Sequence, residues 1–88
     1  MTMTTYLLYN RATPNQAQME ALAAQLKPLL VEAELIDADS PRGIQLAENY
    51  DILARPAVLL VHGDGSPMQI WAGEQIPLAS EIGYMARQ

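Results

Sequence analysis

The sequence predicts an α/β fold in which three helices flank a mixed four-stranded sheet, in the order βαβαββα. Three observations predict it. Short runs of β-branched, aromatic and aliphatic residues indicate strands. Two segments place a capping residue and a proline ahead of apolar residues at helical spacing, and a tight-turn sequence separates the last two strand-like runs. The 88 residues fit one domain, and we expect it to span residues 1–88 without an internal repeat.

The first strand and the first helix are predicted from the opening quarter of the chain. Thr4 to Tyr9 is rich in β-forming residues and apolar on both faces at its centre, as in a strand covered on both sides. Thr13-Pro14 is typical of an N-cap followed by proline at the first helical position. The helix should end or kink just before Pro28, which removes a backbone hydrogen bond. Its apolar residues recur near helical spacing: Met19, Leu22, Leu26, Leu29 and Leu30.

A second strand and a short second helix follow. Val31 to Asp37 alternates apolar and charged residues, which predicts a strand with one more exposed face, at an edge of the sheet. Asp39-Ser40-Pro41 repeats the signal of a cap followed by proline. The apolar residues that indicate the helix behind it are Ile44, Ala47 and Tyr50.

The last third of the chain predicts a hairpin and a final helix. After the connector Asp51 to Arg55, the unbroken apolar run Ala57 to His62 indicates a buried strand. The turn Gly63-Asp64-Gly65-Ser66 favours an antiparallel hairpin with the strand Met68 to Trp71. Pro77 is expected to open the last helix. That helix would carry Leu78, Ile82 and Met85 on one side.

The composition excludes several classes of function. Five basic residues stand against ten acidic ones, giving a net charge of −5 without a basic patch. We therefore expect no nucleic-acid partner and no anionic membrane partner. No apolar run is long enough to span a bilayer. There is no cysteine, so the chain forms no disulfide or thiolate–metal site. We expect a cytoplasmic protein without a metal or a cofactor.

The order and spacing of three features resemble the thioredoxin-like superfamily over nearly the whole chain. They are the strand and cap from Tyr9 to Gln16, the entry to the third strand at Ile52 to Val58, and the hairpin that ends in Trp71-Ala72-Gly73. The resemblance implies that Pro56 occupies the position of the family's cis-proline. It also implies that Thr13-Pro14-Asn15-Gln16 stands where the family has Cys-x-x-Cys. Thiol–disulfide exchange needs a thiolate, which this chain lacks.

A narrower resemblance covers roughly the first two-thirds of the chain. Leu8-Tyr9, Thr13-Pro14-Asn15, Leu35-Ile36-Asp37 and Ile52 to Pro56 look like the circadian-clock protein KaiB and KaiB-like sensor domains. Those proteins also lack the paired cysteines and work by binding other proteins. The chain departs from that family at Arg55, where threonine is usual, and in its Asp-Gly hairpin.

The candidate binding residues are Thr13, Pro14, Asn15, Gln16, Arg55 and Pro56. The helix N-terminus at Thr13 to Gln16 offers backbone N–H groups and a dipole that can hold an anion or a partner's carboxylate. Capping alone also explains these residue types. Arg55 can clamp a carboxylate, and the family resemblance implies that its backbone can pair with an extended peptide. A solvated arginine or a surface ion pair is the alternative.

Other conspicuous residues have structural explanations. Asp37, Asp39 and Ser40 are interpreted as a strand end and a helix cap, because a hard cation needs more oxygen ligands. His62, the single histidine, has no nucleophile at an informative spacing. The turn Gly63 to Ser66 lacks the spacing and the lysine of a phosphate-binding loop. We expect core or half-buried positions for the aromatic residues Tyr6, Tyr9, Tyr50 and Trp71.

These observations predict a non-catalytic thioredoxin-like domain that binds a protein or a peptide. One alternative is a binder of glutathione or a similar small carboxylate without turnover, and another is a KaiB-like regulatory protein. The strand Met68 to Trp71 is expected at a sheet edge, where it could pair with a second copy to give a homodimer, although Pro67 partly protects it.

Overall fold

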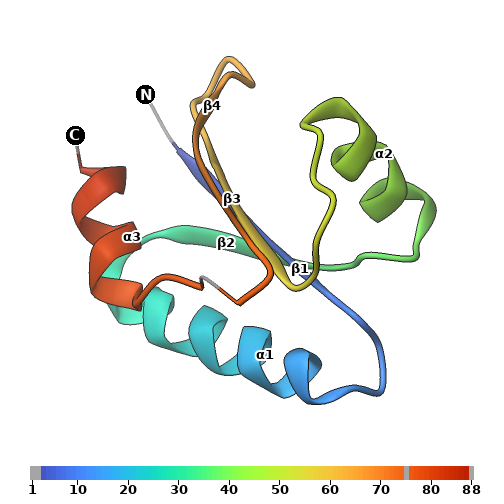
Figure 1. Ribbon diagram of the computed structural model, residues 1–88. Helices are drawn as coiled ribbons and strands as arrows, with labels where there is room; N and C mark the ends of the chain where they lie inside the picture. The colour runs from blue at the N-terminus through green and yellow to red at the C-terminus, as the bar shows by residue number, and fades with distance from the viewer. Residues whose placement is uncertain (1–2, 75, 88) are drawn as a thin grey trace.

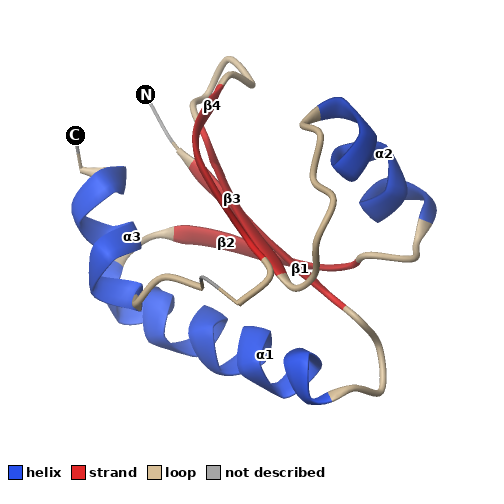
Figure 2. Ribbon diagram, in the orientation of Figure 1, coloured by secondary structure: helices blue, strands red, loops and turns tan. Residues whose placement is uncertain are grey.

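The computed structural model describes residues 3–74 and 76–87. They form one mixed sheet with helices on both faces (Figure 1, Figure 2). The strand order is β2-β1-β3-β4, with β1 parallel to β2 and β3 antiparallel to both β1 and β4. The predicted order βαβαββα is confirmed. The elements are β1 (Thr4–Tyr9), α1 (Pro14–Leu26), the 3-10 helix η1 (Lys27–Leu29), β2 (Glu32–Asp37), α2 (Pro41–Asn49), β3 (Ala57–Val61), β4 (Pro67–Ala72) and α3 (Ala79–Ala86).

The core lies in two layers, one on each face of the sheet. Successive residues of a strand point to opposite faces, so Leu7 of β1 packs with the α1 and α3 layer and Leu8 with the α2 layer. Figure 2 shows α1 and α3 on one side of the strands and α2 on the other. All five residues of β3 are buried, as the run Ala57 to His62 predicted, but the strand ends at Val61 and the half-buried His62 lies outside it. The aromatic residues Tyr6, Tyr9, Tyr50 and Trp71 are half-buried against these layers, as expected.

Helix α1 begins and ends where its prolines predict. Pro14 is its first residue, and the α-helix gives way to η1 at Lys27, next to Pro28. Leu30 follows in the left-handed conformation with φ 60° and donates its N–H to Lys27 O. Leu30 is 93% exposed. Its predicted place in the apolar spacing of the helix is wrong, because the helix has already ended.

Helix α2 docks closely on the loop that leaves β2. Ser40 caps it as predicted: its Oγ accepts from Gly43 N at 3.1 Å and donates to Asp37 O at 2.6 Å. Gly43 is buried, and a Cβ there would lie 2.8 Å from Ala38 Cα. The helix faces the sheet through Leu46, Ala47 and Tyr50. Ile44, which also indicated the helix, is 47% exposed and does not share that face.

The hairpin of β3 and β4 has the predicted antiparallel pairing, and β4 is an edge strand. Gly65 takes a positive φ of 90°, which glycine adopts without strain. Ile70 packs on the α2 layer and Trp71 on the α1 layer, so they lie on opposite faces as expected. The Tyr50 hydroxyl donates to Gly65 O at 2.5 Å and fastens the end of α2 to this turn. A homodimer through Met68 to Trp71 stays a prediction.

Helix α3 begins later than predicted. Leu78 is its N-cap and is 69% exposed, and Ala79 is the first helical residue. Pro77 is buried outside the helix, so its predicted role of opening the helix is wrong. Glu81 fixes the start instead, because its Oε1 accepts from Leu78 N at 3.3 Å. Of the described helices, none has the length and apolar character needed to cross a membrane.

Strand β2 lies at the opposite edge of the sheet from β4, as its alternating pattern predicted. The apolar residues of that pattern are less buried than expected. Ala33 is exposed and Leu35 is 39% exposed, although both project on the α1 face, as their register with Thr5 and Leu7 shows. Helix α1 therefore leaves the outer part of this face uncovered.

Gly43→Ala should lower the free energy of unfolding by about 1–2 kcal/mol, because overpacking against the backbone of Ala38 outweighs the gain in helix propensity. Urea unfolding measures it. Gly83→Ala is the matched control within α3. A Cβ there meets the flexible end of Leu29 at 3.1 Å, so the cost should be smaller. Equal effects at the two glycines would contradict the close contact at Gly43.

Thr5→Val should raise the free energy of unfolding by about 1 kcal/mol. Thr5 is fully buried and its Oγ1 has no hydrogen-bond partner among the described residues. A buried unsatisfied hydroxyl is destabilising, and valine keeps its shape. Urea unfolding again provides the measurement, with the half-buried Thr4→Val as control. A loss of stability in Thr5→Val would show that the hydroxyl has a partner.

Candidate functional site

The predicted binding residues lie on loops at one edge of the sheet. Tyr9 at the end of β1 pairs with Asp37 at the end of β2, and Leu8 pairs with Ala57 at the start of β3. The loops 10–13, 38–40 and 53–56 therefore share this edge, which we call the loop edge (Figure 1). Backbone hydrogen bonds join its parts: Ala38 N donates to Tyr9 O at 2.8 Å, and Gly73 N donates to Pro56 O at 2.9 Å.

Side chains of the first turn of α1 fold back on the loop before it. Asn15 Oδ1 accepts from Asn10 N at 2.7 Å, and Asn15 Nδ2 donates to Asn10 Oδ1 at 3.1 Å. Gln16 Oε1 accepts from Ala12 N at 2.8 Å. This bracing holds Ala12 at a φ of 61°, in the left-handed region that non-glycine residues seldom adopt. Asn15 and Gln16 thus fix the shape of the loop.

Thr13 has the N-cap position but not the predicted side-chain role. Its backbone is extended, with φ −124° and ψ 165°, and its side chain makes no cap hydrogen bond. The hydroxyl points back to the loop instead, 2.6 Å from Asn10 O and 2.9 Å from Asn15 Oδ1. Gln16 N donates to Thr13 O at 3.0 Å. Several donors that an anion would use at this helix end are therefore already engaged.

Two arginine–aspartate pairs cross the loop edge. Arg55 Nη1 lies 2.5 Å from Asp39 Oδ1, and Arg55 Nη2 lies 3.4 Å from Ala38 O. Arg11 Nη2 lies 3.3 Å from Asp37 Oδ2. Asp37 and Asp39 were interpreted from the sequence as a strand end and a cap. They also pair with two arginines. The parallel pairing of β1 with β2 brings Arg11 to Asp37, and the antiparallel pairing of β1 with β3 brings Arg55 to the same edge as Asp39.

Leu53 to Arg55 form the most open stretch of the loop edge. Leu53 is 96% exposed. In the part of the chain that the structure describes, the backbone N–H and C=O groups of these three residues have no hydrogen-bond partner. The following Arg55–Pro56 peptide bond is cis. A surface groove runs beside this stretch toward α2, lined by Ile44, Ala47, Glu48, Asp51, Ile52, Leu53 and Arg55.

The structure thus brings the two groups of candidate residues to the same edge without joining them directly. Within residues 3–74 and 76–87, no hydrogen bond links Thr13 to Gln16 with Arg55 or Pro56. Arg55 contacts the loop after β2 instead. Sequence reasoning missed Leu53. It stands between Ile52 and Ala54 in the connector, and the sequence does not distinguish the buried Ile52 from the exposed Leu53.

His62 lies at the other end of the sheet, in the β3–β4 turn, where its N–H donates to Ser66 O at 2.8 Å. Hydrogen bonds from the Ser66 hydroxyl and N–H lower the pKa of Asp64 below its usual value of 3.8, and His62 adds a smaller effect. These contacts stabilise the turn. Across the described residues, no three His, Asp or Glu side chains gather in a way that could hold a metal ion.

Solved structures share this fold. Thioredoxin O2 from Arabidopsis thaliana in the oxidized state matches with a TM-score of 0.72 at 11% identity, over 98% of this chain and 74% of that chain. A thioredoxin from Thermus thermophilus matches with a TM-score of 0.65 at 20% identity, over 99% and 72%. A malarial protein matches with a TM-score of 0.73 at 10% identity, over 99% and 97%. No protein-family model and no curated protein matches the chain.

These matches establish a thioredoxin-like fold, as the sequence resemblance predicted, in a chain that has no cysteine. At these low sequence identities, the matches show a shared fold and nothing about function. These structural matches do not test the narrower resemblance to KaiB, which stays a prediction.

Asn15→Ala should lower the free energy of unfolding by about 1–2 kcal/mol, because it removes the acceptor of Asn10 N and the donor to Asn10 Oδ1. Urea unfolding measures the loss, and the amide of Asn10 should exchange faster with solvent. Gln18→Ala, on an exposed position of the same helix, is the control and should change little. A neutral Asn15→Ala would show that the loop keeps its shape without the side chain.

Proposed function

We propose that this chain is a non-catalytic, cysteine-free thioredoxin-like domain that binds an extended peptide segment of a protein partner at the loop edge. One observation carries the proposal: Leu53 to Arg55 present unpaired backbone groups beside an exposed leucine and a groove lined by both apolar and charged side chains. An extended peptide can satisfy such backbone groups as an added strand would, while side-chain pockets provide selectivity.

The chemistry of the loop edge favours a peptide with an apolar anchor. Leu53 and Ile44 border the groove and are 96% and 47% exposed, so a partner side chain that covers them removes apolar surface from water. Arg55 is already paired with Asp39. A partner's carboxylate would have to compete with this aspartate, which makes apolar contact and backbone pairing the main source of affinity.

The geometry gives less support to the alternative that the helix N-terminus binds glutathione or a similar small carboxylate. Ala12 N and Gln16 N already have acceptors within the loop, which reduces the number of donors for an anion. A KaiB-like regulatory role and a cytoplasmic location stay predictions. They are compatible with peptide binding, but neither the fold nor the loop edge favours them over other roles.

The test is selection of peptides from a displayed random library. Peptides that bind the wild-type protein should lose binding to the double variant Leu53→Asp, Arg55→Ala by at least about tenfold, because the apolar anchor and the neighbouring cation are both removed. Nuclear magnetic resonance shifts on binding should concentrate at residues 53–56 and spread to 10–16.

Leu78→Asp is the matched control, since it places a carboxylate on an exposed leucine of the N-cap of α3. This variant should bind the selected peptides as the wild type does, and circular dichroism should confirm that all variants are folded. If no peptide distinguishes the double variant from the control, the loop edge is not the binding surface.

A further inference from the structure

Helix α2 carries at both ends the charge that opposes its dipole. Carboxylates are stabilising near the N-terminus of a helix, and cations are stabilising near its C-terminus. Arg42 stands in the first turn of α2, whereas the last turn holds Glu48 and no basic residue, and Asp51 follows just after the C-cap. A compensating charge from outside the helix would therefore stabilise each end.

The described part of the chain compensates the N-terminal end alone. Arg42 pairs with Glu34 of β2 and lies over the ring of Tyr6, 5.5 Å from its centroid. Glu48 and Asp51 are exposed, and within residues 3–74 and 76–87 neither makes an ion pair. Asp51 also has a positive φ of 55°, at a helix position that glycine or asparagine usually occupies. Because local stability rules are most often broken at functional sites, this helix end is a candidate contact for a cation.

The two carboxylates line the same groove as the proposed peptide site. Beside Glu48 and Asp51 lie apolar side chains, of which Leu53 is 96% exposed. The groove also includes Arg55, whose charge is neutralised by Asp39. The charge that remains without a partner in the groove is therefore negative, and it adjoins exposed apolar surface.

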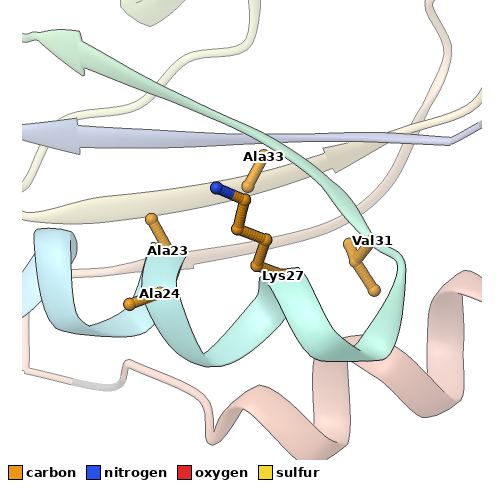
Figure 3. Close-up of a pocket in the computed structure, with 5 residues that line it drawn as sticks. All are labelled: Ala23, Ala24, Lys27, Val31 and Ala33. Carbon is orange, nitrogen blue, oxygen red and sulfur yellow. The ribbon is translucent and has the colours of Figure 1, made fainter.

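The groove between the end of α1 and β2 has the opposite charge. It is lined by Ala23, Ala24, Lys27, Val31 and Ala33, and Figure 3 shows the Lys27 side chain reaching toward the strand. Lys27 is the C-cap of α1, where a cation is stabilising. A basic side chain of a ligand would thus be repelled beside α1 and attracted beside α2.

We propose, on the basis of the peptide site described above, that the bound segment carries a lysine or arginine close to its apolar anchor, and that this cation pairs with Glu48 and Asp51. The anchor covers Leu53, and the cation supplies the positive charge that the end of α2 lacks. Because both carboxylates are exposed, their field is screened beyond about 8 Å at physiological ionic strength. The pairing therefore acts once the segment lies in the groove, and it slows dissociation.

A basic side chain fits this end of α2 better than a metal ion does. A hard cation such as Ca²⁺ takes roughly six to eight oxygen ligands, and across the described residues no three acidic or histidine side chains gather to hold one. Lysine and arginine form charge-assisted hydrogen bonds with one or two carboxylates. Their aliphatic stems also cover apolar surface, which the groove offers beside Glu48 and Asp51.

The experiment selects binders of the full chain from two displayed peptide libraries, each with a fixed central leucine. The flanking positions vary over uncharged residues and lysine in one library, and over uncharged residues and glutamate in the other. We expect the best lysine peptides to bind at least about fivefold tighter than the best glutamate peptides. Glu48→Gln, Asp51→Asn should weaken the lysine peptides about three- to tenfold through faster dissociation. It should also raise the melting temperature of the free protein by about 1–4 °C, because two charges that oppose the helix dipole are removed.

Glu32→Gln, which removes the same charge from an exposed position of β2, is the matched control and should change binding by less than about twofold. The inference is overturned if the double variant binds lysine peptides as the wild type does, if the control weakens them equally, or if glutamate peptides bind as tightly. In these cases the peptide site still stands when Leu53→Ser, which removes the apolar contact without a charge change, weakens the selected peptides. Lysine peptides that bind Leu53→Ser as tightly as the wild type, or libraries without binders, overturn both proposals.

Discussion

The fold depends on covering the central strand β3 from both sides and along both edges. Each of its five residues is buried, and β1 and β4 flank it. Because successive residues face opposite layers, Val58 requires α1 and α3 while Leu59 requires α2. An 88-residue chain has little apolar surface to spare. The two central strands receive most of it, so the outer strands β2 and β4 remain only partly covered.

This distribution explains where binding surfaces can arise. Hydrogen bonds of Asn15 and Gln16 brace one side of the loop edge, and the Arg55–Asp39 pair spans the other. The open stretch of this edge at Leu53 keeps unpaired backbone groups. The edge of β2 is less covered for a different reason: the groove beside it is lined by the small Ala23 and Ala24 of α1 and by Lys27 of η1.

The sequence predicted the order of elements well, because each element has a local signal. Thr13-Pro14 and Ser40-Pro41 mark helix starts, Pro28 marks an end, and Asp64-Gly65 marks the hairpin. It failed where tertiary contacts decide. Pro77 offers a proline without a capping residue before it, and it is buried ahead of the helix. Ala33 and Leu35 follow a strand pattern, yet whether they are covered depends on how far α1 extends over the sheet. The pairing of Asp37 and Asp39 with arginines likewise depends on strand register.

The two arginine–aspartate pairs also shape how a partner reaches the loop edge. Arg11, Arg55, Asp37 and Asp39 cancel one another, so the net charge of −5 resides on the rest of the surface. Long-range electrostatic steering toward the loop edge is therefore weak, and the encounter rate there should depend little on ionic strength. Discrimination among partners would then rest on how slowly the correct complex dissociates.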